Sequence, residues 1–142
     1  MKTIWIVLGI AAAIGLAGFS AGLSVGQEKK MARVYELRTY TTHPGRLPAL
    51  EKRFAEHTLK LFEKHGMKNE MYWIPTDAAK KDNTLIYVVS HENQEAADKS
   101  WKAFGADPDW IKARDASEAD GKILAKAPDK VFMTLTDYSP SK

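Results

Sequence analysis

The chain has 142 residues, of which 44% are hydrophobic and 27% are charged, and it contains no cysteine. This length accommodates one compact domain, and the composition is that of a globular protein rather than a disordered or collagen-like chain. The lack of cysteine excludes a disulfide scaffold, a thiolate metal site and a cysteine nucleophile. A formal net charge of +3, carried by scattered lysines, argues against nucleic acid as a partner.

Residues 1–26 have the pattern of an export signal or of an N-terminal membrane anchor. After a short positive start, the chain carries no charge until Glu28. The length of this segment favours an anchor, whereas its glycine and alanine content and the small-x-small tripeptide 24–26 (SVG) favour cleavage after Gly26. Translation from an internal start at Met31 is a third alternative. The first two predict a periplasmic or secreted domain over residues 27–142, which meets the inner membrane only through an uncleaved leader.

The rest of the chain begins with the predicted order strand, helix, strand, strand. Residues 33–40 (RVYELRTY) are β-branched and aromatic and alternate in polarity, which is typical of a strand. The apolar spacing from Leu47 onward indicates a helix, and His65-Gly66 ends it because glycine accepts the left-handed backbone of a helix terminus. Residues 67–74 and 84–90 are the second and third predicted strands.

Two helices are predicted after the third strand. Asn93 is a suitable N-cap for a helix that extends to Phe104, and Gly105 is expected to interrupt it. Asp107-Pro108 then starts another helix, with a capping carboxylate and a proline at the first helical position. Residues 130–138 (KVFMTLTDY) form the last predicted strand.

The order βαββαβ predicts an α+β, ferredoxin-like fold in which helices cover one face of a four-stranded antiparallel sheet. The predicted strands are apolar on both faces. The residues that alternate are Leu85, Ile86, Tyr87, Val88 and Val89 in the third strand and Val131, Phe132, Met133, Leu135 and Tyr138 in the last. Because the helices cover only one face, we expect a homodimer that packs sheet to sheet as a dimeric α/β barrel. The alternative is a monomer whose strands fill a small core.

The histidines supply one candidate for catalysis. The chain has no Gly-rich phosphate loop, no GxSxG or HExxH motif and no carboxylate-rich loop, so we expect neither a metal nor a cofactor. His57 lies at the edge of the apolar helix stripe, where it would line a cleft between helix and sheet, and it is the candidate base. As a structural residue it would be a boundary histidine. We expect His43 in a turn, His65 packed or capping at the helix end, and His91 opening the next helix.

Charged and aromatic side chains supply candidates for ligand binding. Glu36 and Arg38 are two residues apart in the first strand and therefore share a face with Tyr40. This pair either fixes strand register or the dimer interface, or Arg38 holds an anionic or carbonyl group of a small molecule. Tyr40, Trp73 and Trp101 would line the apolar part of such a pocket; the alternative is that they belong to the ordinary core.

An ordered set of motifs resembles the NIPSNAP family: 35–40 (YELRTY), Pro44-Gly45, His65-Gly66, Trp73, 83–87 (NTLIY) and 101–110 (WKAFGADPDW). The resemblance covers residues 33–138 and implies a ferredoxin-like subunit of a dimeric α/β barrel. The wider superfamily includes cofactor-independent monooxygenases, small-molecule isomerases and haem enzymes, which use the cleft between sheet and helices. The NIPSNAP family itself has no settled reaction.

The sequence therefore leaves open whether the protein is an enzyme. One hypothesis is a protein that binds a small apolar or aromatic molecule in the cleft, with Arg38 or His57 as the polar contact. The alternative is a cofactor-independent monooxygenase or isomerase in which His57 removes a proton, since an imidazole titrates near neutral pH. A purely structural dimer is the third hypothesis. The enzyme requires His57 to share one cavity with Arg38 or a tyrosine hydroxyl.

Overall fold

The computed structural model describes residues 33–140, so the predicted leader, residues 1–26, lies outside the described part of the chain. Within residues 33–140, no helix combines the length and the apolar character needed to cross a membrane. One antiparallel sheet in the order β2-β3-β1-β4 consists of β1 (Val34–Thr41), β2 (Lys68–Trp73), β3 (Thr84–His91) and β4 (Asp129–Met133). This is the predicted α+β, ferredoxin-like arrangement.

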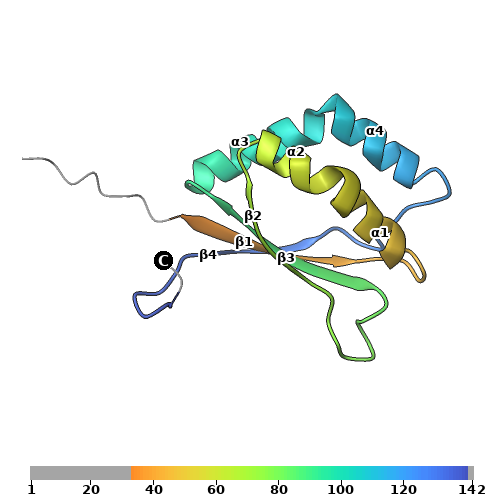
Figure 1. Ribbon diagram of the computed structural model, residues 1–142, viewed down its shortest axis with the longest axis horizontal. Helices are drawn as coiled ribbons and strands as arrows, with labels where there is room; N and C mark the ends of the chain where they lie inside the picture. The colour runs from red at the N-terminus through yellow and green to blue at the C-terminus, as the bar shows by residue number, and fades with distance from the viewer. Residues whose placement is uncertain (1–32, 141–142) are drawn as a thin grey trace, which may run out of the picture.

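The helices lie together on one face of the sheet (Figure 1). They are α1 (Leu47–Arg53), the π-helical segment η1 (Phe54–Thr58), α2 (Leu59–Lys64), α3 (Gln94–Ala106) and α4 (Pro108–Ser117). The first three are consecutive and correspond to the single helix predicted from Leu47. In η1 the backbone N–H of Leu59 donates to the carbonyl of Phe54, which inserts one extra residue into the turn.

The predicted caps of the helices are confirmed. The side chain of Asn93 accepts a hydrogen bond from the backbone N–H of Ala96 at 2.8 Å, and Asp107 accepts one from Asp109 at 2.8 Å. Gly66 follows α2 with a φ of 79°, a conformation that favours glycine. The expected break at Gly105 is wrong, because α3 continues to Ala106.

The last strand is shorter than predicted. It ends at Met133, so Leu135 and Tyr138 lie beyond it and the expected strand over residues 130–138 is wrong in its second half. The reason is the register with β1: Met133 is paired with Tyr35, and β1 begins only one residue earlier, at Val34. β4 is an edge strand, and it has no further length of β1 to pair with.

The hydrophobic core lies between the sheet and the helices. Its fully buried members include Leu50 from α1, Phe62 from α2, Tyr87 and Val89 from β3, and Ile123 from the loop before β4. Along β3 the side chains that face the helices alternate with those on the opposite face. The core therefore fixes which face of every strand is turned toward the helices.

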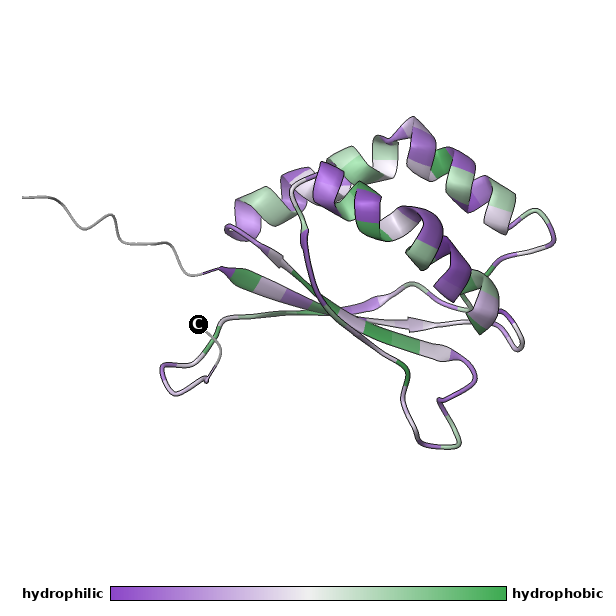
Figure 2. Ribbon diagram, in the orientation of Figure 1, coloured by the Kyte–Doolittle hydropathy of each residue, from purple (hydrophilic) through white to green (hydrophobic). Residues whose placement is uncertain are grey.

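The outer face of the sheet is apolar and open in the single chain. Cross-strand pairing places Met71 opposite Val88 and Trp73 opposite Ile86 on this face, and hydrophobic residues occur along the strands in Figure 2. Its most exposed hydrophobic side chains are Met71 (57%), Trp73 (45%), Val131 (55%) and Met133 (36%). The predicted apolar character of both strand faces is confirmed, and this surface is the one that the expected homodimer would cover.

Candidate functional site

A carboxylate lies at the centre of the polar interior. Glu36 projects from β1 toward the helices and is completely buried. Its Oε1 accepts a hydrogen bond from Nε of Arg38 at 2.8 Å. Its Oε2 lies 3.0 Å from Nε2 of His91 in β3 and accepts a hydrogen bond from Nε1 of Trp101 in α3 at 2.5 Å. This buried cluster, formed by Glu36, Arg38, His91 and Trp101, links three elements of the fold.

The donors of the buried cluster keep its carboxyl group ionised. Burial alone raises the pKa of Glu36, but the hydrogen bonds from His91 and Trp101 and the charge of Arg38 outweigh burial and lower the pKa below its ordinary value. Since the carboxylate only accepts, Nε2 of His91 is assigned as a donor. Nδ1 of His91 is buried and has no hydrogen-bond partner among residues 33–140.

The guanidinium of Arg38 is fixed by contacts on the side that faces the core, whereas its two terminal nitrogens are accessible to solvent. The centre of its guanidinium lies 3.5 Å from the centroid of the Trp101 ring, and its side chain is 13% exposed. Within residues 33–140 only Nε makes a hydrogen bond, and neither terminal nitrogen is sealed from solvent. A guanidinium fixed in this way offers two parallel donors to a planar acceptor from outside.

Aromatic side chains fill the space in the middle of the sheet. Tyr40 accepts a hydrogen bond from the hydroxyl of Tyr87 at 3.0 Å, and the ring of Phe54 packs against both tyrosines with centroids 5.8 Å and 5.2 Å away. Phe62 packs edge-on to Trp101 at 5.2 Å. Tyr40 is therefore a packed residue beside Arg38, and these rings occupy the centre of the predicted cleft between helices and sheet.

Trp73 does not belong to this site. It is paired with Ile86 on the outer face of the sheet, whereas Trp101 and Tyr40 are on the helix side. The expectation that Trp73 lines the same pocket as Arg38 is therefore not met. The bulge in β2 between Asn69 and Met71 shifts the register of this edge strand, and such an irregularity is not visible in the sequence.

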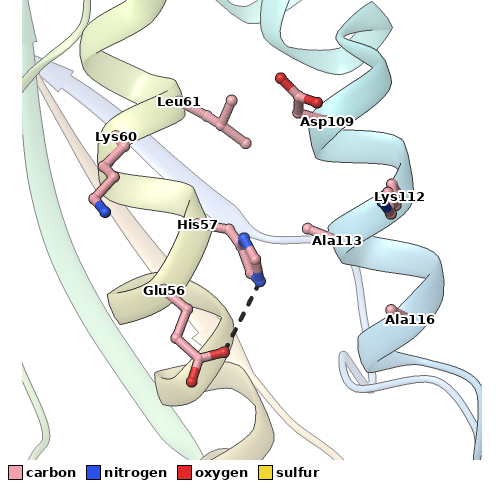
Figure 3. Close-up of a pocket in the computed structure, with 8 residues that line it drawn as sticks. All are labelled: Glu56, His57, Lys60, Leu61, Asp109, Lys112, Ala113 and Ala116. Atoms are coloured by element: carbon pink, nitrogen blue, oxygen red, sulfur yellow. Dashed lines mark ion pairs between the residues drawn. The ribbon is translucent and has the colours of Figure 1, made fainter.

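His57 lies in a different place from the one predicted. It projects between η1 and α4 into a hollow of about 400 Å³, together with Glu56, Leu61 and Ala113 (Figure 3). Its side chain is 50% exposed, and its Nε2 lies 3.9 Å from Glu56. Arg38 is not among the residues that line this hollow or the one beside it. The predicted position at the edge between helix and sheet fails because the extra residue of η1 changes the helical angle there.

The other histidines also have defined contacts. His43 is exposed in the turn after β1, as predicted, and His65 caps α2 and lies 2.6 Å from Asp107. His91 is the last residue of β3 and is buried, so the prediction that it opens the next helix is wrong. Asn93 has that role.

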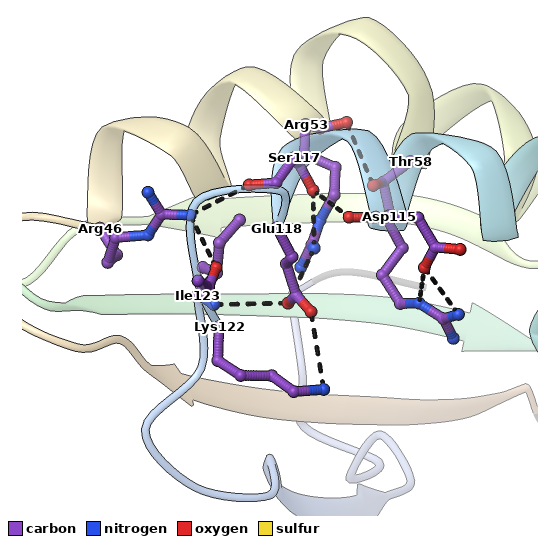
Figure 4. A network of polar contacts seen from close by, with 10 residues as sticks. Arg46, Arg53, Thr58, Asp115, Ser117, Glu118, Lys122 and Ile123 are labelled. Carbon is purple, nitrogen blue, oxygen red and sulfur yellow. Dashed lines mark hydrogen bonds and ion pairs between the residues drawn. The ribbon is translucent and has the colours of Figure 1, made fainter.

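A second polar network fastens the end of α4 to the first helix (Figure 4). Arg53 is buried and binds Ser117 at 3.1 Å and Glu118 at 3.4 Å. Arg46 donates to the carbonyl oxygens of Ser117 and Gly121 at 3.0 Å and 2.9 Å. Burial lowers the pKa of Arg53 more than the nearby carboxylate of Glu118 raises it. The network joins residues of the chain to one another, so we regard it as structural.

Within residues 33–140 there is no group of three or more His, Asp or Glu side chains arranged to hold a metal ion.

The sequence profile of the NIPSNAP family matches residues 35–140. The chain belongs to the NIPSNAP family. No curated protein matches it significantly.

Solved NIPSNAP structures share the fold of this chain. One, from Agrobacterium tumefaciens and of unknown function, is 18% identical, with a TM-score of 0.64 over 78% of this chain and 94% of the other. An uncharacterised NIPSNAP-like protein from Burkholderia xenovorans is 14% identical, with a TM-score of 0.65 over 78% and 90%. A monooxygenase from Streptomyces coelicolor, in complex with Nanaomycin D, is 19% identical, with a TM-score of 0.52 over 77% and 92%.

The buried cluster of this NIPSNAP chain was only partly visible in its sequence. The spacing of Glu36 and Arg38 predicts their pairing, and the ion pair is confirmed. His91 was missed, although it continues the series Leu85, Tyr87, Val89 at every second position. That period of two is the signal that could have placed it on the buried face.

Proposed function

We propose that this NIPSNAP protein is a homodimer that binds a small apolar or aromatic molecule on the helix side of its sheet. Arg38 is the polar contact, and Trp101 supplies the aromatic surface. The observation that carries the proposal is the state of Arg38: Glu36 and Trp101 fix its inner side, while its terminal nitrogens have no acceptor within residues 33–140. A donor that is positioned in advance loses little entropy when it binds a ligand.

The proposed ligand lies toward the β1–β4 side of the sheet. The centre is occupied by the packed rings of Tyr87, Phe54 and Phe62. β4 is the edge strand, and its partly buried Phe132 is paired with Glu36. The ligand would therefore contact Arg38 from the side of β4 rather than enter the middle of the core.

The homodimer rests on the outer face of the sheet. Contiguous apolar residues on one face are characteristic of protein interfaces. Here the strand register places Met71, Val88, Leu37 and Val131 in one row across the outer face of the sheet. A second copy of the chain offers the same surface, so two sheets can pack around a two-fold axis. In this arrangement the helix side, with Arg38, stays open to a ligand.

We propose export of the protein on the basis of residues 1–26 of the sequence, which lie outside the described residues. The domain would then be periplasmic or secreted, and it would be tethered to the inner membrane if the leader is kept. N-terminal sequencing of the protein from its own host distinguishes these outcomes, because cleavage after Gly26 leaves Gln27 as the first residue.

Native mass spectrometry of the protein purified from its own host tests the proposal. We expect the mass of two chains plus a small compound that is released on denaturation. Arg38→Gln should lose the compound, and Arg114→Gln is the matched control because Arg114 is exposed and, among residues 33–140, pairs only with its neighbour Asp115. A bare monomer would contradict both the dimer and the binding function.

A cofactor-independent monooxygenase or isomerase with His57 as the base is the second candidate function. Its support is the fold shared with the Streptomyces coelicolor monooxygenase. We prefer binding because the two hollows that His57 lines are not lined by Arg38. Oxygen uptake with an enolisable aromatic substrate, lost in His57→Ala, would favour the enzyme instead.

A further inference from the structure

Two cations lie directly opposite each other on the helix side of the sheet. The register of β1 and β4 pairs Arg38 with Lys130, and directly paired residues of antiparallel strands share a face. Arg38 faces the helices, because its guanidinium stacks on Trp101 of α3. Lys130 therefore projects on the same side of the sheet. Like charges at such positions repel each other unless a negative group lies near them.

The described residues provide only one negative charge for these two cations. Arg38 is paired with Glu36, whereas Lys130 makes no salt bridge within residues 33–140. Both oxygens of Glu36 already accept from Arg38, His91 and Trp101. The positive charge of Lys130, whose side chain is exposed beside the buried cluster, is therefore left without a counterpart among the described residues.

Lys126, which precedes Lys130 in the same segment, differs from Lys130 because it has a carboxylate partner. Lys126 binds the carboxylate of Asp129 at 2.5 Å, just before Lys130 in the chain. Asp129 is paired with Thr39 on the outer face, so it is directed away from Arg38. The segment thus neutralises the lysine outside the site and leaves the one inside it unpaired.

Aromatic rings flank both cations. Arg38 lies over the Trp101 ring, and Nζ of Lys130 lies 5.9 Å from the centroid of the Phe132 ring. Phe132 is partly buried and is paired with Glu36, so it lies along β4 beside the cluster. A ligand between the cations therefore meets positive charge and aromatic surface together.

We propose that the ligand of this site is an aromatic carboxylate, whose carboxylate lies between Arg38 and Lys130 and whose ring packs against Trp101 or Phe132. This inference rests on the proposed binding function. The planar carboxylate matches the two free terminal nitrogens of Arg38, and Lys130 supplies the second charge. A neutral aromatic compound would fill the same apolar surface but would leave Lys130 and the terminal nitrogens of Arg38 without a negatively charged acceptor.

The test compares 2-naphthoate with 2-naphthamide, a neutral compound of the same shape, by titration calorimetry on the full chain. We expect the carboxylate to bind at least about tenfold more tightly, the equivalent of one charge-assisted hydrogen bond. Lys130→Gln should remove about tenfold of the affinity for naphthoate and leave that for naphthamide unchanged. Lys126→Gln, which removes a paired lysine, should change neither. Binding of naphthoate should also weaken as salt is added.

The outcomes separate this inference from the proposed function. Equal binding of the two probes, or an unchanged affinity in Lys130→Gln, overturns the aromatic carboxylate while small-molecule binding stands. Binding of neither probe also overturns the inference, and the native mass measurement then decides the proposed function independently. A neutral compound found with the native protein confirms binding and overturns the carboxylate. Circular dichroism verifies that Lys130→Gln is folded, as expected for an exposed side chain on an edge strand.

Discussion

Replacement of Glu36 by glutamine should destabilise the protein strongly although it preserves the shape of the side chain. The carboxylate accepts from Arg38 with one oxygen and from His91 and Trp101 with the other. A glutamine can present its oxygen to only one of these sides, and its amide N–H group then faces a donor on the other. The better orientation keeps His91 and Trp101 bonded and leaves Arg38 without its carboxylate.

Removal of one partner from a buried ion pair typically costs about 3–5 kcal/mol. The tip of Arg38 still reaches solvent, so we expect the lower end, a loss of about 3 kcal/mol in the free energy of unfolding. Urea unfolding followed by far-UV circular dichroism at pH 7 and one fixed protein concentration measures this loss. Glu56→Gln is the control: its carboxylate is exposed and lies 3.9 Å from Lys52, so the change should be below about 0.5 kcal/mol.

A loss of less than about 1 kcal/mol in Glu36→Gln, with an unchanged m-value, would refute this argument, because it would mean that the buried ion pair of Glu36 with Arg38 contributes little to stability. Trp101→Phe provides a second measurement. It removes one donor and keeps most of the ring surface, so it should cost about 1–2 kcal/mol and couple to Glu36→Gln in a double-mutant cycle. Independent effects of the two substitutions would contradict the shared cluster.

Three further outcomes are expected. Gly66→Ala should destabilise the protein by about 1–2 kcal/mol because φ at this position is 79°. Gly105→Ala lies in a helix with open space around it and should stabilise the protein by up to about 1 kcal/mol. Urea unfolding of the two variants should therefore give changes in the free energy of unfolding with opposite signs. Hydrogen bonds from Lys64 and His65 hold the pKa of Asp107 well below its ordinary value. The stability that the ionised Asp107 confers is therefore present above about pH 4 and is lost as the pH falls toward the pKa of the folded state. Asp107→Asn should show a weaker dependence of the urea midpoint on acid pH. Val131→Glu should dissociate the proposed dimer in sedimentation velocity, and Ile111→Glu, an exposed apolar residue of α4, should not.

Local patterns in the sequence were sufficient for the order and type of the elements. Alternation identified the strands, and the capping residues Asn93 and Asp107 located two helix starts to within a residue. These signals work because an N-cap or a strand alternation is decided by neighbours in the chain. One error occurred where a distant partner decides. The end of β4 depends on where β1 begins, and the sequence of β4 contains no information about that.

In the candidate site, too, some contacts followed from local sequence patterns and others depend on residues far apart in the chain. The pairing of Glu36 with Arg38 followed from their spacing, but the participation of His91 and Trp101 brings residues together that are 55 and 65 positions from Glu36. His57 was placed from an ideal helical angle of about 100° per residue, and the π-helical segment invalidates that angle. Trp73 was assigned to a pocket by residue type alone, although the register of β2 places it on the outer face.

The sequence by itself determined that this chain forms a ferredoxin-like sheet with apolar residues on both faces, because strand period and residue type act over short distances. Only the tertiary structure decided which residues from distant parts of the chain join the pair of Glu36 and Arg38. Strand register and helix packing bring Arg38 beside Trp101 and Lys130, and they direct His57 into another groove. Burial makes the contacts of Glu36 consequential, since a buried charge is stable only where the fold supplies its partner.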